Sequence, residues 1–225
     1  EINNNNNNNN QIDLSKYFTK FNEDLENKTF HINKPEESKQ TPYEYLQDIL
    51  ENLLEEEKNA VKQFGYMKNQ TNLNENMRAI LIDWVIEVHY KFKLLTETLF
   101  LTVNLIDRFL IGKKIERKKF QLIGISAMLI ACKYEEIYSP ELRDFVYISN
   151  KTFDAEEILK MEIEMLSLLK YEICFPSVNR YYEIFCILFN FSEKEITLGK
   201  YLTEIFLIDY RYCKYNSSLI ACSVC

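Results

Sequence analysis

The stretch Met77-Arg-Ala-Ile-Leu-Ile-Asp-Trp-Val-Ile-Glu-Val-His-Tyr-Lys-Phe92 has the most regular pattern in the sequence. Its apolar residues recur at the i, i+3, i+4 and i+7 positions that share one face of an α-helix. Asn74 precedes it and belongs to the residue types that cap helix starts. We therefore expect a long amphipathic helix that begins after Asn74 and includes Phe92.

Helical patterns lie on both sides of this segment. Upstream, Thr41-Pro-Tyr-Glu44 offers an N-cap, a proline at the first helical position and a glutamate at the third, which predicts a helix over 42–59. Only four glycines and four prolines occur, which leaves little room for turn-rich β structure. We expect an all-α protein, with further helices over 96–110, 117–134, 154–170, 176–189 and 192–212 and a short helix that begins at 139–141.

Two short sequence echoes indicate an internal duplication. Leu129-Ile-Ala-Cys132 recurs as Leu219-Ile-Ala-Cys222, and Leu105-Ile-Asp107 recurs as Leu207-Ile-Asp209. Chance is the alternative in a chain rich in leucine and isoleucine. Because the echoes fall at matching positions in successive helices, we favour two stacked helical repeats.

The expected division of the chain follows from these patterns. Residues 1–40, with an asparagine tract from Asn3 to Asn10, are polar and aperiodic and predict a disordered leader. An N-terminal helix and linker would occupy 41–73, a first repeat 74–171 and a second repeat 172–225. The second repeat stops inside an apolar run, so we expect it to be incomplete and the chain to be a fragment.

Composition and motifs argue against several classes of function. The net charge of −7 disfavours binding to nucleic acid or to an anionic membrane. No apolar run reaches the ~20 residues that span a bilayer, and no secretory signal begins the chain, so we expect the nucleus and cytoplasm. The cysteines are expected to be free and mostly buried, because Cys222-x-x-Cys225 lacks the second pair of a zinc site.

Nothing in the sequence predicts catalysis. His31 and His89 have no nucleophile motif near them, and no glycine-rich phosphate loop occurs. We expect no catalytic residue, no cofactor and no metal.

Several linked motifs, in order, resemble the first cyclin box of A- and B-type (mitotic) cyclins. They are Gly65-Tyr-Met-Lys68, Met77 to Trp84, Glu87 to Phe92, Glu97-Thr-Leu99, Asn104 to Phe109, Ala131 to Glu136 and Phe145 to Ile148. The resemblance implies a cyclin fold of two five-helix repeats, here with the second truncated and with a helix in front. It also implies a regulatory subunit that binds and activates a cyclin-dependent kinase in a G2/M-type role.

The same resemblance implies a kinase-binding surface. Lys133 and Glu162 match the family's lysine and glutamate that hydrogen-bond backbone around the kinase's mobile helix, and Tyr134 matches an aromatic contact. Tyr45 and Ile49 match positions of the leading helix that pack on the kinase. Taken alone, Lys133 fits a lysine at a helix end and Glu162 a solvated helix face.

A second site implied by the family is a groove for substrates or inhibitors that carry Arg-x-Leu motifs. Met77, Ile80 and Trp84 share one stripe of a helix, Glu87 continues it, and Gln121 matches a further groove residue. Apolar pockets would take the leucine and the carboxylate would pair with the arginine. A helical Met/Trp stripe is otherwise most often core.

Some alternatives stay open. The basic cluster Lys113, Lys114 and Arg117 to Lys119 is either a solvated loop or a phosphate-recognition site. The runner-up functions are a transcription-associated cyclin and a general transcription factor with cyclin-like repeats. No arginine precedes Arg78, so we expect a destruction signal of the Arg-x-x-Leu kind to be absent or to lie outside this chain.

Overall fold

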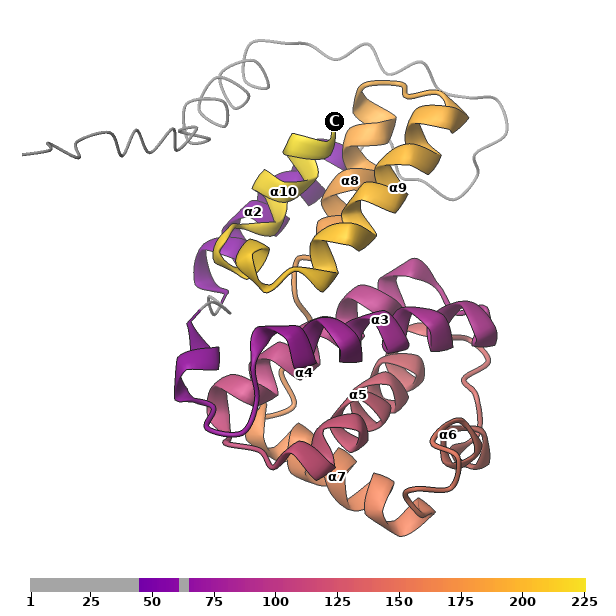
Figure 1. The fold of residues 1–225 in the computed structure, drawn as a ribbon. Coiled ribbons are helices and arrows are strands. Elements are labelled where there is room, and N and C mark those ends of the chain that lie inside the picture. Colours follow the sequence, from indigo (N-terminus) through magenta and orange to yellow (C-terminus); the bar gives the residue numbers. More distant parts are fainter. Residues whose placement is uncertain (1–44, 61–64) are drawn as a thin grey trace, which may run out of the picture. The chain divides into compact units, whose positions relative to one another are not determined.

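A computed structural model describes residues 45–60 and 65–225, which all belong to one unit of the chain, Ile32–Cys225. Within these residues every regular element is a helix (Figure 1). The predicted leader and the predicted helix start at 41–44 lie outside them. The α-helices are α2 (Leu46–Asn59), α3 (Glu75–Phe92), α4 (Thr96–Gly112), α5 (Phe120–Glu135), α6 (Leu142–Ile148), α7 (Ala155–Leu168), α8 (Val178–Leu188), α9 (Glu193–Ile208) and α10 (Ser217–Val224).

The helix starts follow the caps that the sequence offers. The Asn74 side chain accepts a hydrogen bond from the Met77 N–H at 2.9 Å, which satisfies one of the free N–H groups at the start of α3. Asp154 with Glu157, and Ser192 with Glu195, form capping boxes at α7 and α9. Short 3₁₀ helices, η2 (Tyr66–Asn69), η3 (Arg117–Lys119) and η4 (Tyr210–Lys214), join the longer elements.

Helix α5 is the centre of a first group of helices. It contacts α3, α4, α6 and α7 and is buried from Phe120 to Cys132 except at Gln121. Small residues allow these neighbours to approach closely. A methyl group placed on Gly124 would meet the Leu81 side chain of α3 at 3.0 Å, so only glycine fits there without displacement. A helix predicted over 117–134 is thus the centre of this group, and its small residues let the neighbouring helices pack against it.

A second group consists of α8, α9 and α10, with α2 packed against α8 (Figure 1). The carboxylate of Glu57 in α2 accepts hydrogen bonds from the Ser218 N–H at 2.9 Å and from its hydroxyl, and so caps the start of α10. The two Leu-Ile-Ala-Cys segments lie in α5 and α10. Helix α5 is the third α-helix counted from α3, and α10 is the third counted from α8. The assignment of five helices to each repeat stays a prediction.

The buried side of α2 is formed by Leu46 and Leu50, whereas Tyr45 at its start is exposed. One helix end differs from the sequence prediction, because the helix predicted over 192–212 ends at Ile208. The last carbonyls, of Leu207 and Ile208, accept hydrogen bonds from the guanidinium of Arg78 at 2.9 and 3.1 Å, which satisfies groups that a helix end leaves free.

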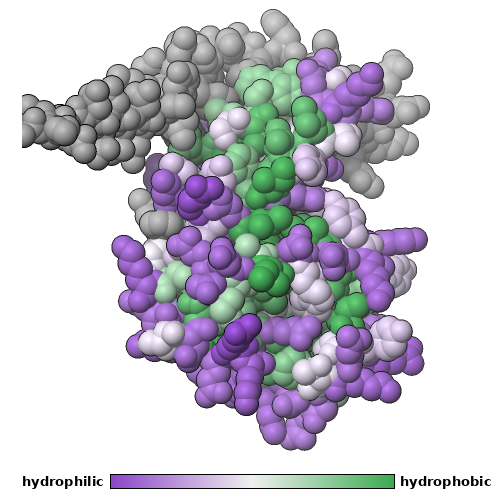
Figure 2. Space-filling view, viewed as in Figure 1, coloured by the Kyte–Doolittle hydropathy of each residue, from purple (hydrophilic) through white to green (hydrophobic). Residues whose placement is uncertain are grey.

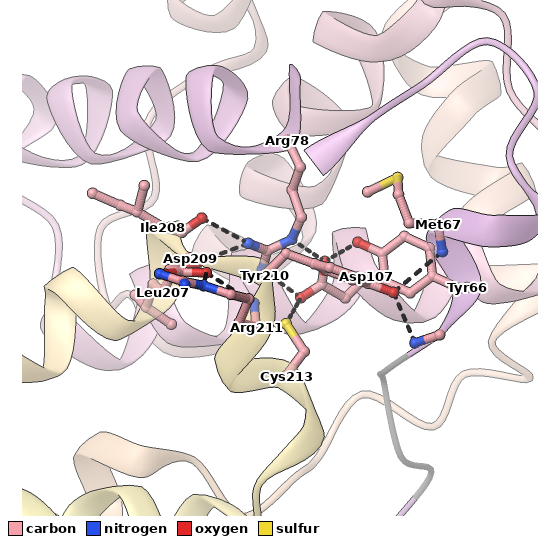
Figure 3. A network of polar contacts seen from close by, with 11 residues as sticks. Tyr66, Met67, Arg78, Asp107, Leu207, Ile208, Asp209, Tyr210, Arg211 and Cys213 are labelled. Carbon is pink, nitrogen blue, oxygen red and sulfur yellow. Dashed lines mark hydrogen bonds and ion pairs between the residues drawn. The ribbon is translucent and has the colours of Figure 1, made fainter. Parts of the chain in front are cut away.

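Arg78 is the centre of a buried polar network (Figure 3). Its side chain is 1% exposed and donates twice to the Asp107 carboxylate of α4, with both N···O distances 2.7 Å. The Tyr66 hydroxyl donates to the same carboxylate at 2.6 Å. Burial alone would lower the pKa of Arg78, but the neighbouring Asp107 outweighs it and raises that pKa, so the guanidinium stays charged.

Tyr210 extends this network to the segment before α3. Its hydroxyl accepts hydrogen bonds from the backbone N–H groups of Gly65 and Met67 at 2.8 and 3.2 Å. Its ring meets the Tyr66 ring edge to face, with centroids 5.1 Å apart. The network therefore joins η2, α3 and α4 of the first group to the end of α9 in the second.

His89 is a buried titratable group in α3. It is largely enclosed, and its Nδ1 has no hydrogen-bond partner among the described residues. Burial lowers the pKa of His89, and the Glu136 carboxylate opposes this only in part.

No helix in the described residues is long and apolar enough to cross a membrane.

We predict that Asp107→Ala lowers the free energy of unfolding by about 3–5 kcal/mol, because it leaves a buried guanidinium without its counter-charge. Urea unfolding followed by circular dichroism measures this. The control is Lys58→Ala, which removes an exposed ion pair with Glu55 and should change stability by less than about 1 kcal/mol. Equal effects of the two substitutions would contradict the role of the buried pair.

We predict that part of the stability is lost as the pH falls from 7.5 to 5.5 through His89. The unfolded imidazole has an ordinary pKa near ~6.5 and takes up its proton first, so this contribution is full above that value and declines below it. His89→Gln should show a smaller loss over the same range in urea unfolding. An identical pH dependence in the parent and the variant would contradict the prediction.

Candidate functional site

Lys133 and Glu162 form an ion pair between the last turn of α5 and the middle of α7. The distance from Nζ to Oε1 is 2.6 Å, and the two side chains are 51% and 10% exposed. Taken alone, Glu162 fits a solvated helix face, but in the structure α7 packs this side against α5. A nearly buried carboxylate thus holds a half-exposed ammonium group at the surface.

Exposed aromatic and apolar residues lie near this pair along the chain. Tyr134 follows Lys133, is about half exposed, and its hydroxyl hydrogen-bonds to Cys174, which raises the pKa of Tyr134 to about 12. Further large apolar side chains, which the sequence prediction missed, are exposed close to the pair along the chain: Ile137, Tyr138, Ile163 and Tyr171. The exposure of Ile163 could have been predicted from the sequence, because this residue lies outside the buried face of α7 that Ile158, Met161 and Met165 define.

Tyr45 and Ile49 lie at the start of α2. Tyr45 is exposed and Ile49 is partly buried, while their neighbours Leu46 and Leu50 point inward. Helix α2 packs against α8, so these two residues belong to a different group of helices from the Lys133–Glu162 pair (Figure 1). The structure does not bring the two halves of the predicted kinase-binding surface into contact.

The predicted groove lies on α3. Met77 and Trp84 are partly buried against the core, whereas Ile80 is 70% exposed and Glu87 is exposed. Figure 2 shows apolar side chains gathered on the face that carries α3. The neighbouring stripe of α3, which consists of Leu81, Val85 and Val88, is part of the core. Gln121, in the first turn of α5, is partly buried.

The remaining features that the sequence singles out are the basic cluster and the cysteines. The five residues of the basic cluster are all exposed, and Lys113 pairs with Glu164 of α7. All six cysteines carry free thiols, of which Cys174 and Cys225 are exposed. In residues 45–60 and 65–225, no three His, Cys, Asp or Glu side chains come close enough to hold a metal ion.

Comparison with known proteins identifies the family. A family profile described as "Cyclin, N-terminal domain" matches residues 48–174. The chain belongs to the cyclin family. The "Cyclin-B2-1" of Arabidopsis thaliana is 44% identical over 79% of this chain, and the "G2/mitotic-specific cyclin-A" of Patella vulgata is 41% identical over 81%. The "Cyclin-A2" of Gallus gallus is 42% identical over 79%.

These relatives are longer than the chain, which spans 42%, 43% and 45% of their lengths, respectively. A solved viral cyclin from herpesvirus saimiri has the same fold, with a TM-score of 0.73 over 78% of this chain and 79% of that one, at 22% identity. The predicted A/B-type cyclin family and the all-α cyclin fold are therefore confirmed. The individual site residues stay predictions.

Proposed function

We propose that this cyclin is a regulatory subunit that binds and activates a cyclin-dependent kinase during G2/M-type progression, in the nucleus and cytoplasm. The observation that carries the proposal is the Lys133–Glu162 pair at the surface of the matched cyclin domain. The names of similar proteins, which include a G2/mitotic-specific cyclin-A, support the timing. In this proposal the chain regulates the kinase, and the kinase carries out the catalysis.

The pair is suited to binding a partner's backbone. An ammonium group has three donors, and in Lys133 only one is directed at Glu162. The others are free to donate to carbonyl oxygens of a partner. Because the nearly buried Glu162 already fixes the position of the lysine, less conformational entropy is lost on binding. The exposed aromatic and apolar side chains nearby would supply the buried area.

Activation would follow from selection of one kinase conformation. Phosphoryl transfer requires the kinase's C-helix glutamate to pair with the lysine that positions ATP. A rigid helical surface that binds only the inward position of that helix shifts the population toward the active state. The packing of α5 between four other helices provides this rigidity.

Substrate docking would use the α3 groove. Ile80 and the partly buried Met77 and Trp84 offer an apolar surface for a leucine, and Glu87 offers a carboxylate for an arginine. Gln121 would contribute hydrogen bonds from α5. Docked peptides would then meet the kinase at raised effective concentration.

We predict that the Lys133→Ala/Glu162→Ala double variant binds a purified, unactivated cyclin-dependent kinase about 100-fold more weakly than the parent in calorimetry. Charge-assisted hydrogen bonds of this kind contribute roughly 1.5–3 kcal/mol each. The matched control is Lys160→Ala/Glu156→Ala, which removes an exposed pair from α7 and should leave the affinity unchanged. Equal affinities of all three folded proteins would contradict the proposed interface.

We predict that Ile80→Ala/Glu87→Gln weakens binding of a synthetic Arg-x-Leu peptide at least about tenfold, because it removes an apolar contact and a counter-charge. Fluorescence anisotropy of the labelled peptide measures this. Leu198→Ala, which shortens an exposed leucine of α9, is the control. Kinase affinity should not change in either variant, and an unchanged peptide affinity in the groove variant would exclude this docking site.

A further inference from the structure

A cavity of about 630 Å³ lies between the two groups of helices. Its walls come from the end of α2, one side of α4, the segment 172–178, the end of α9 and the start of α10. This volume lies within the range of about 300–1,000 Å³ that is typical of ligand sites. The cavity is separate from the Lys133–Glu162 pair and from the α3 groove, which do not line it.

The α4 wall of this cavity carries Phe100, Asn104 and Arg108. Their spacing of four residues places all three on one helical face, about 6 Å apart along the axis. The wall thus presents an aromatic ring, a carboxamide and a guanidinium in sequence. The other sides carry apolar side chains, among them Phe175, Phe206 and Ile220, together with charged and polar ones.

Asn104 is buried without a partner. Its side chain is 5% exposed, and its Oδ1 accepts no hydrogen bond from any described residue. A buried polar group in that state is unfavourable in the free protein, and native structures contain few of them. The observation therefore points to a ligand that completes the hydrogen bonding of this amide.

Arg108 also lacks a close partner. The described residues offer it no hydrogen bond and no ion pair. Burial lowers the pKa of Arg108, and the nearby charge of Glu172 opposes this. The other cations of the lining are already occupied: Arg78 by Asp107, Lys58 by Glu55 and Lys214 by the ring of Tyr215. Among the acids, the Glu57 carboxylate is bound to Ser218.

We propose that this cavity binds an extended peptide segment of a partner protein. A carboxamide has both a donor and an acceptor and pairs with a peptide group, which has the same two functions. Arg108 would bind a carboxylate, and Phe100 an apolar side chain. Because an extended chain advances about 3.3 Å per residue, the apolar and acidic residues would stand roughly four positions apart.

The test uses a phage-displayed library of random dodecapeptides as the probe. Peptides are first depleted on the folded Arg108→Gln variant and then selected on the parent chain, in the absence of kinase. Depletion removes sequences that bind the α3 groove or the kinase-binding surface, since both are intact in the variant. The expected result is enrichment of peptides with an apolar residue and an acidic residue about four positions apart.

An enriched peptide is then synthesised, and its affinity is measured by fluorescence anisotropy. We expect at least a tenfold loss with Arg108→Gln and with Asn104→Leu, and no change with Trp84→Ala or Lys133→Ala. Asn104→Leu should also raise the melting temperature, because it removes an unpartnered buried amide. If Asn104 instead stabilised the fold, its replacement by leucine would lower the melting temperature.

Two results would overturn the proposal. One is a selection that yields no peptides dependent on Arg108, and the other is affinity that Arg108→Gln leaves unchanged. If Asn104→Leu does not fold, Arg108→Gln alone decides the outcome. Because no kinase is present, failure here leaves the proposed kinase binding unaffected.

Discussion

The buried Arg78–Asp107 pair is the constraint on which the arrangement of the helices depends. A guanidinium removed from water must have its donors satisfied, because an unpaired buried charge is strongly unfavourable. Asp107 satisfies one edge, and the carbonyls of Leu207 and Ile208 satisfy the other. These hydrogen bonds hold the end of α9 against α3, and Tyr210 in the chain that follows accepts hydrogen bonds from the backbone at the start of η2. One side chain thus links segments more than a hundred positions apart.

The surface proposed for kinase binding depends on the helix at the centre of the first group. Small residues along α5 allow α3 to approach closely, as the contact at Gly124 demonstrates. The packing of α7 against α5 buries Glu162 beside the last turn of α5 and leaves Lys133 half exposed. The position of the lysine therefore follows from core packing, and the sequence around it, including Tyr134, sets the chemistry of the surface.

Local patterns predicted the helices well, because periodicity and caps act within a few residues. The cap at Asn74 and the boxes at Asp154 and Ser192 lie where the sequence places them. Pairings between distant segments could not be predicted in this way. Asp107 and Asp209 occupy the same place in the repeated tripeptide, yet the first pairs with buried Arg78 and the second with exposed Arg211. The burial of Glu162 and the unpartnered amide of Asn104 likewise arise only when the helices pack.

We propose that this helical surface activates a kinase. The most direct test of this proposal is the rate at which a purified, unactivated cyclin-dependent kinase phosphorylates a peptide substrate that lacks an Arg-x-Leu motif, measured as the chain is added. We expect the rate to rise and to saturate at the concentration at which calorimetric binding saturates. Saturated binding with no change in rate would contradict it.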